Sequence, residues 1–329
     1  MKPNTKPSRV QIIGRDNGAG LTCDLQLLAD ALRRAGAEVT VKGLPHRGRF
    51  AAWLTTQYLR FAKPAFDVNI MIERIRAEFA GAARINVLVP NPEWFDAASA
   101  GHEDVIARVW VKTHHAIKPF ESHGLPASFI GFTSTDRRLP DVPKERSFFH
   151  GPGRSGAKGT LALLALWAKH PEWPRLTIVW RRKRVDLGTI PANVTVMRER
   201  LDEATYRRLQ NTYTFHLCPS QTEGWGHYIA EAMSVGAVVV TVDAEPMNEL
   251  VSPDRGVLVD ARPAGTQHLA TLYDFDEASM RQGIERCIAM SDEECARLSG
   301  AARAWYETNH AEFPQRVAAA LAATVETAA

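Results

Sequence analysis

The sequence predicts an α/β protein of two domains, each organised around a parallel sheet. Three observations predict this class. The chain has 329 residues, more than a single hydrophobic core usually holds. An apolar strand at residues 9–13 runs into a glycine-containing loop and then a helix, which is how a strand–helix–strand unit begins. A strand at residues 147–150 starts the same pattern again, so we expect a second domain.

The first domain is expected over residues 1–140. Its strands read as nearly continuous apolar runs, which is typical of parallel strands buried on both faces. They are predicted at residues 9–13, 39–41, 68–72, 85–89, 109–111 and 128–131. The loop after the first strand holds Gly14, Gly18 and Gly20, a spacing that does not match the G-x-G-x-x-G fingerprint of NAD-binding proteins. We therefore exclude an NAD-dependent function. The alternative that each glycine serves only to form a tight turn stays open.

Composition narrows the class of protein. Hydrophobic residues make up 45% of the chain and charged residues 23%, as in soluble globular proteins, and the net charge of +3 is too small to indicate nucleic-acid binding. The four cysteines form no Cys-x-x-Cys pair, which favours a reducing compartment and predicts no metal framework. The start of the chain lacks the apolar core of a signal peptide, and no apolar run is long enough to span a membrane. A cytoplasmic location is expected.

Residues 39–66 combine basic and aromatic side chains and contain no acidic residue before Asp67. A segment of this kind can lie on the inner face of an anionic membrane. The alternative is a helix that packs its aromatic side chains inward and leaves its basic face in water. The sequence leaves both open, so peripheral membrane contact is an expectation only.

A polar, proline-containing segment at residues 136–146 predicts a linker between the domains. The second domain is expected over residues 147–305, with further strands at residues 176–180, 194–197, 215–218 and 237–242. One helix is predicted from the capping box at residues 291–294 through Tyr306, and another from Pro314 onward, at residues 315–325. Residues 306–329 are expected to return to the first domain.

The most informative stretch lies between two of these strands. Glu223 stands in a loop and Glu231 follows eight positions later within a helix, while Gly224 and Gly226 leave the backbone bare where that helix begins. Free N–H groups and the positive end of a helix dipole favour a phosphate group at such a place. A carboxylate two turns along the helix can instead accept hydrogen bonds from a ribose. The alternative is an ordinary helix start with two solvated acids.

The residues E-G-W-G-H-Y-I-A-E-A-M, followed by V-G-A-V-V-V-T, resemble the donor-site signature of family-4 (group 1) retaining glycosyltransferases with the GT-B fold. The resemblance implies two Rossmann-like α/β domains with parallel sheets facing a central cleft. It assigns catalytic roles to Glu223, which contacts the donor sugar near the reacting centre, and to Arg154 and Lys158, which bind the diphosphate. It implies donor binding by a larger set: Gly153, Trp225, Gly226, His227, Glu231 at the ribose, Met197 and Arg198 at the nucleobase, Gly18 and Glu249.

The acceptor site is less clear from the sequence. In the family a His near the end of the third strand of the first domain touches the donor sugar, whereas this chain has Met71-Ile72-Glu73 there. The acids at strand ends that could act on an acceptor hydroxyl are Glu73 and Glu93. Lys112 and His114 follow another strand and are expected to contact the acceptor; a metal site at His114 is disfavoured.

The predicted function is therefore transfer of a sugar from a nucleotide-diphosphate sugar, such as a UDP or GDP sugar, to the hydroxyl of a glycan or lipid-linked acceptor. No cofactor and no metal ion are expected. Two alternatives stay open at this stage. One is another GT-B enzyme, a nucleotide-sugar epimerase or a phosphorylase, and the other is an inactive glycan- or lipid-binding module.

Overall fold

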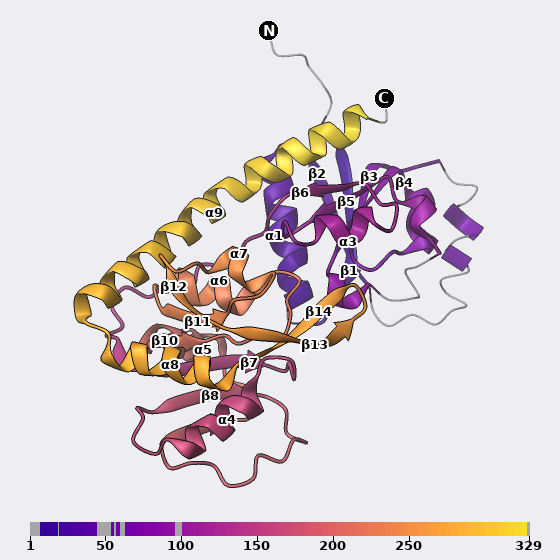
Figure 1. Ribbon diagram of the computed structural model, residues 1–329. Coiled ribbons are helices and arrows are strands. Elements are labelled where there is room, and N and C mark those ends of the chain that lie inside the picture. The colour runs from indigo at the N-terminus through magenta and orange to yellow at the C-terminus, as the bar shows by residue number, and fades with distance from the viewer. Residues whose placement is uncertain are drawn as a thin grey trace. The chain divides into compact units, whose positions relative to one another are not determined.

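The computed structural model describes residues 7–18, 20–44, 54–55, 57–59, 63–95 and 101–327. The chain divides into two compact units (Figure 1), which we call unit 1 (Met1–Thr133, Gln267–Leu269 and Asn309–Ala329) and unit 2 (Ser134–Thr266 and Ala270–Thr308). Each unit contains one six-stranded sheet, so the predicted α/β class is confirmed. Much of the basic and aromatic segment 39–66 lies outside the described residues, and its membrane contact stays a prediction.

In unit 1 the strand order is β2-β1-β3-β4-β5-β6, and every pair is parallel. The strands are β1 (Arg9–Arg15), β2 (Glu38–Leu44), β3 (Phe66–Glu73), β4 (Ala83–Pro90), β5 (Arg108–Val111) and β6 (Ala127–Phe129). The helices are α1 (Gly20–Arg34), η1 (Ala77–Ala82), η2 (Pro92–Trp94), η3 (Glu103–Val105) and α3 (Ile117–Glu121). From β1 the sheet extends in one direction to β2 and in the other direction through β3 to β6. The switch point, where ligands bind in open α/β sheets, therefore lies between β1 and β3.

In unit 2 the strand order is β12-β11-β10-β7-β8-β9, again parallel throughout. The strands are β7 (Glu145–Gly153), β8 (Leu176–Trp180), β9 (Val194–Met197), β10 (Tyr213–Leu217), β11 (Val238–Val242) and β12 (Gly256–Val259). The helices are α4 (Thr160–Lys169), α5 (Glu203–Thr212), α6 (His227–Ser234), α7 (Met247–Leu250) and α8 (Glu277–Ala289), and β13 (Ala261–Gln267) pairs with β14 (Ala270–Phe275). This sheet changes direction between β7 and β10, which is its switch point.

The C-terminal part of the chain forms one helix, α9 (Asp292–Glu326), drawn in yellow in Figure 1. The prediction of two helices separated at Pro314 is wrong, because Pro314 lies inside α9. Proline removes one backbone hydrogen bond from a helix. Packing of the neighbouring turns compensates, since Tyr306, Phe313 and Val317 are all buried. Within the described residues, no helix combines the length and apolar character needed to cross a membrane.

Candidate functional site

Two loops meet at the switch point of unit 2. One joins β7 to α4, the other joins β10 to α6, and the backbone N–H of Gln221 in the second loop donates to the carbonyl of Ala157 in the first (3.0 Å). Gly159 permits the close approach. Its φ is +65°, and a Cβ there would lie 2.9 Å from the carbonyl oxygen of Pro219. The loops that the sequence predicts to bind the donor are therefore joined through their backbones.

Lys158 and Glu223, one from each loop, form an ion pair. Their side chains are only 14% and 11% exposed. The Ser220 hydroxyl donates to the same carboxylate oxygen of Glu223, and the Lys158 Nζ lies 4.6 Å from the centre of the Tyr228 ring. The sequence assigns Lys158 and Glu223 to the donor site separately, and the structure brings them into direct contact.

Two titratable groups near this ion pair are neutral. Burial raises the pKa of the Cys218 thiol and the pKa of the Tyr228 hydroxyl, which lies 2.5 Å from the Ser220 hydroxyl. Both groups therefore stay protonated near neutral pH. Lys158 lowers the pKa of Cys218 and Glu231 raises it, so both charges are felt at the end of β10.

Glu231 belongs to a second polar network in unit 2. Its carboxylate accepts a hydrogen bond from the side-chain NH₂ group of Gln210 (2.8 Å). The side-chain oxygen of Gln210 in turn accepts a hydrogen bond from the Arg137 guanidinium (2.9 Å). Burial raises the pKa of the nearby Tyr206, and the charge of Glu231 raises it further. No motif in the sequence points to Gln210 or Arg137. Arg137 falls in the predicted linker, yet only 8% of it is exposed.

The N-termini of α4 and α6 both face this switch point from the loops just described. Gly159 and Gly226 precede them with left-handed backbones, and neither helix receives a hydrogen bond from the side chain of its N-cap residue. First-turn N–H groups without a side-chain cap are suited to bind an anion. Near the start of α6, the Trp225 indole donates to the Ser134 hydroxyl (3.3 Å), which lies 2.8 Å from Nδ1 of His227.

The remaining predicted donor residues are more scattered. Arg154 is exposed on the β7–α4 loop just after Gly153, whose φ is +62°. Met197 ends β9, and the next residue, Arg198, donates to the carbonyls of Arg182 and of Val185 (2.8 Å). Arg198 thus holds a neighbouring loop. Of the two further predicted residues, Glu249 lies in α7 and Gly18 (φ +61°) lies in unit 1. Their roles in donor binding stay predictions.

In unit 1, Glu73 ends β3 at the switch point of that sheet. Its φ of +71° is in the left-handed region, which is a sparsely populated conformation for a residue other than glycine. Burial raises the pKa of its carboxyl. Among the residues that the structure describes, the Glu73 carboxylate makes no hydrogen bond. A strained backbone at a ligand-binding edge is the kind of feature that functional sites retain.

Next to this edge, Lys112 and Asp24 form a buried ion pair, with 2.6 Å between Nζ and the carboxylate. The Asn91 side chain accepts a second hydrogen bond from Nζ (2.9 Å), and the Phe132 ring lies 4.7 Å away. An anionic acceptor would therefore compete with Asp24 for Lys112. The sequence alone did not indicate this ion pair.

The two other predicted acceptor residues lie on separate elements of unit 1. Glu93 is in η2, and its backbone carbonyl accepts a hydrogen bond from Gln267 (2.9 Å). The exposed His114 ring stacks on Phe129, with 3.7 Å between the ring centres. Neither of these contacts involves Glu73, and the acceptor roles of Glu93 and His114 stay predictions.

Comparison with known proteins bears on the family and the fold. Residues 184–273 match the family described as glycosyl transferases group 1, which confirms the resemblance seen in the sequence. No curated protein matches the chain.

Solved structures resemble nearly the whole chain. HepE from Anabaena, in complex with UDP-glucose, gives a TM-score of 0.71 at 15% identity over 96% of this chain and 100% of that chain. A glycosyltransferase from Rickettsia africae gives 0.70 at 12% identity, covering 98% of each chain. Sucrose-phosphate synthase from Thermosynechococcus elongatus gives 0.69 at 14% identity over 96% and 97%. These likenesses confirm the predicted GT-B fold.

Proposed function

We propose that this chain, a glycosyltransferase of the group 1, GT-B type, transfers a sugar from a nucleotide-diphosphate donor to an acceptor hydroxyl and retains the anomeric configuration. The observation that carries the proposal is the Lys158–Glu223 ion pair at the switch point of unit 2. It joins the two loops that the family resemblance assigns to the donor. HepE binds UDP-glucose, which supports UDP sugars as the first donors to test.

In the proposed reaction the acceptor oxygen attacks the anomeric carbon on the face from which the diphosphate departs. The bond from the anomeric carbon to the diphosphate oxygen breaks, and the acceptor proton passes to that oxygen. An ammonium group has three donors, so Lys158 can hold Glu223 with one and the leaving diphosphate with another. Together with the uncapped helix N-termini, this charge would stabilise the departing anion. The mechanism needs no metal ion.

On the acceptor side, we propose that Glu73 orients the attacking hydroxyl. It stands at the switch point of the unit 1 sheet. Among the described residues its carboxylate makes no hydrogen bond, so it can accept one from a ligand hydroxyl. A carboxylate can accept a hydrogen bond from the acceptor hydroxyl and so fix the orientation of that hydroxyl.

The test begins with a thermal-shift panel of UDP, GDP and ADP sugars, in which the true donor raises the melting temperature most. Lys158→Met should then lower the single-turnover transfer rate by roughly 10²–10³-fold, as expected for the loss of one group that stabilises a developing anion. Lys169→Ala is the matched control, because Lys169 is an exposed lysine on α4 that pairs with Glu277.

Removing Lys158 leaves Glu223 as a largely buried charge, which by itself can destabilise the fold. The double variant Lys158→Met/Glu223→Gln removes both charges and should stay folded but inactive. Wild-type transfer rates in the folded double variant would overturn the mechanism. Conversion of the donor sugar without an acceptor would indicate an epimerase instead.

A further inference from the structure

Trp94 is exposed at the carboxyl edge of the unit 1 sheet. It is the last residue of η2, the single turn that follows β4, and 44% of it is exposed. The other tryptophans that the structure describes are buried or half-buried, as is usual for so large an apolar side chain. One exposed apolar residue is ordinary on a protein surface, so its position and its support decide whether it has a function.

The position of Trp94 is close to Glu73 on the same edge of the sheet. Glu73 ends β3 and pairs in register with Pro90 at the end of β4, and neighbouring strands lie roughly 4.8 Å apart. The chain then makes one tight turn, in which the backbone N–H of Trp94 donates to the Asn91 carbonyl (2.9 Å). Such a turn rises only about 2 Å per residue, so it does not carry Trp94 far from the strand end. The indole and the Glu73 carboxylate therefore belong to one ligand-binding edge.

The turn that carries Trp94 is fixed by a distant part of the chain. Residues 267–269, at the tip of the β13–β14 hairpin, belong to unit 1. They donate two hydrogen bonds to this turn, one to the carbonyl of Pro92 (3.2 Å) and one to the carbonyl of Glu93 (2.9 Å). The next residue, Phe95, is buried in the core of unit 1. A surface that is already rigid loses little conformational entropy when a ligand binds to it.

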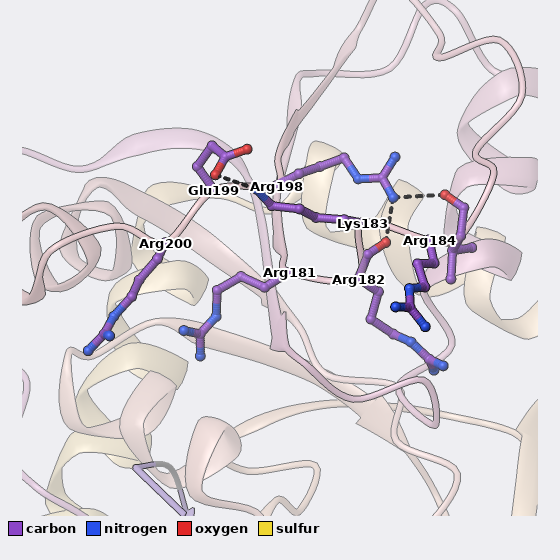
Figure 2. A pocket seen from close by; sticks show the side chains of 8 residues that line it. Arg181, Arg182, Lys183, Arg184, Arg198, Glu199 and Arg200 are labelled. Atoms are coloured by element: carbon purple, nitrogen blue, oxygen red, sulfur yellow. Dashed lines mark hydrogen bonds and ion pairs between the residues drawn. The ribbon is translucent and has the colours of Figure 1, made fainter.

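The two units offer different chemistry to a ligand. In unit 2, loops at the carboxyl ends of β8 and β9 line a pocket of about 490 Å³ with six basic residues and one acid (Figure 2). Arg198 is one of them, so this pocket belongs with the proposed donor site, where its charge suits an anionic nucleotide. In unit 1 the buried cation of the edge, Lys112, is already compensated by Asp24 (2.6 Å). An indole face and a carboxylate suit a neutral ligand with C–H groups and hydroxyls.

We propose that Trp94 is a platform on which a sugar ring of the acceptor stacks, while Glu73 accepts a hydrogen bond from the reacting hydroxyl. The face of an aromatic ring carries negative charge density, so it attracts the polarised C–H groups on the flat side of a pyranose. The inference rests on the proposed function and narrows its acceptor to a molecule that presents a sugar ring. Trp94 then determines acceptor specificity without taking part in the bond changes.

The binding test titrates the protein with the methyl pyranosides of glucose, galactose, mannose and N-acetylglucosamine and follows the indole N–H signals by NMR. The Trp94 signal, identified by its loss in Trp94→Leu, should shift with at least one sugar. That sugar should bind Trp94→Leu roughly 3- to 10-fold more weakly, as expected for the loss of one aromatic contact. Trp94→Tyr is the matched control, because it keeps an aromatic face, and should bind nearly as wild type. Equal losses in both variants, or no shift with any of these sugars, would overturn the proposal.

A kinetic test separates this inference from the proposed function. With the donor found by thermal shift, Trp94→Leu should raise the KM for the sugar acceptor by the same factor and leave kcat and the KM for the donor nearly unchanged. A lower kcat at unchanged acceptor KM would indicate a structural role and contradict the platform. Transfer to octanol but to none of the sugars would overturn the sugar acceptor and leave the proposed function standing. Sugar binding at Trp94 without any transfer would support the platform and count against the proposed function.

Discussion

A left-handed backbone costs a residue other than glycine roughly 1–2 kcal/mol, and Glu73 carries that cost at the end of β3. We predict that Glu73→Gly raises the free energy of unfolding by about 1 kcal/mol, because glycine adopts this φ without strain. The same variant should lose most transfer to the acceptor while it still binds the donor nucleotide, whose proposed site is in unit 2. Guanidinium denaturation and nucleotide titration measure the two effects.

Glu73→Gln is the matched control for that prediction. Glutamine removes the half-buried charge as glycine does but keeps the strained backbone. The difference in stability between the two variants therefore isolates the backbone contribution. If Glu73→Gly is no more stable than Glu73→Gln, the positive φ stores no strain and the structural argument for this residue fails.

At the level of single residues, the motifs name candidates but do not indicate which of them are in contact. Lys158 and Glu223 are assigned to the donor site by their motifs, but 65 positions separate them and nothing in their spacing indicates an ion pair. The buried pair of Asp24 and Lys112 was missed for the same reason, since Asp24 lies in α1 and Lys112 in the loop after β5. Contacts of this kind depend on strand order, which the sequence alone does not fix.

At the level of elements, Gly159 tests how the two donor loops are held together. We predict that Gly159→Ala weakens nucleotide binding by roughly tenfold or more, because a Cβ 2.9 Å from the Pro219 carbonyl pushes apart loops that position Lys158 and Glu223. Gly188→Ala is the control. Gly188 has φ +60°, and the described structure leaves at least 4 Å of open space around the position that its Cβ would take, so this variant shares the backbone strain without the clash. Equal nucleotide affinity in both variants would show that strain alone matters.

Buried strands were the elements that the sequence predicted best. The predicted bounds of β8 and β9 agree with the structure. β8 is buried throughout, and strands covered on both faces leave continuous apolar runs, whereas β9 lies at the edge of the sheet and is only partly buried. The pair β13 and β14 was missed, since β13 is mostly exposed and its residues ARPAGTQ include proline and glycine without any alternation. Helix α8 was missed as well. For α9 the sequence predicted a break that the structure does not have, because packing along the helix outweighs the low helix propensity of Pro314.

At the scale of the whole molecule, the two units should differ in their response to acid. In unit 2, burial lowers the pKa of His150 to about 4 and that of His216 to about 3. A carbonyl can only accept, so Nδ1 of neutral His150 donates to Leu217 (2.7 Å) and Nε2 accepts from the Thr160 hydroxyl (2.9 Å). His150 thereby links β7 to β10 and to the start of α4, and protonation would break this arrangement.

The sign of the pH effect follows from proton uptake. Both histidines have a lower pKa in the folded state than the value near 6.5 expected when unfolded, so the unfolded chain binds more protons as the pH falls. Their contribution to stability is present above pH 6.5 and is lost as the pH falls toward 4. Between pH 6.5 and pH 5, unit 2 should lose roughly 3 kcal/mol.

None of the described histidines of unit 1 is buried, so these residues do not give unit 1 the acid sensitivity expected for unit 2. Calorimetric scans should therefore show one transition at pH 7.5 shifting strongly to lower temperature at pH 5, and the second much less. The variant His150→Gln/His216→Gln should be less stable at pH 7.5 but should lose this pH dependence, because it removes both titrating groups. An unchanged pH dependence in that variant would mean that other groups set the acid response, and equal shifts of both transitions would place it outside unit 2.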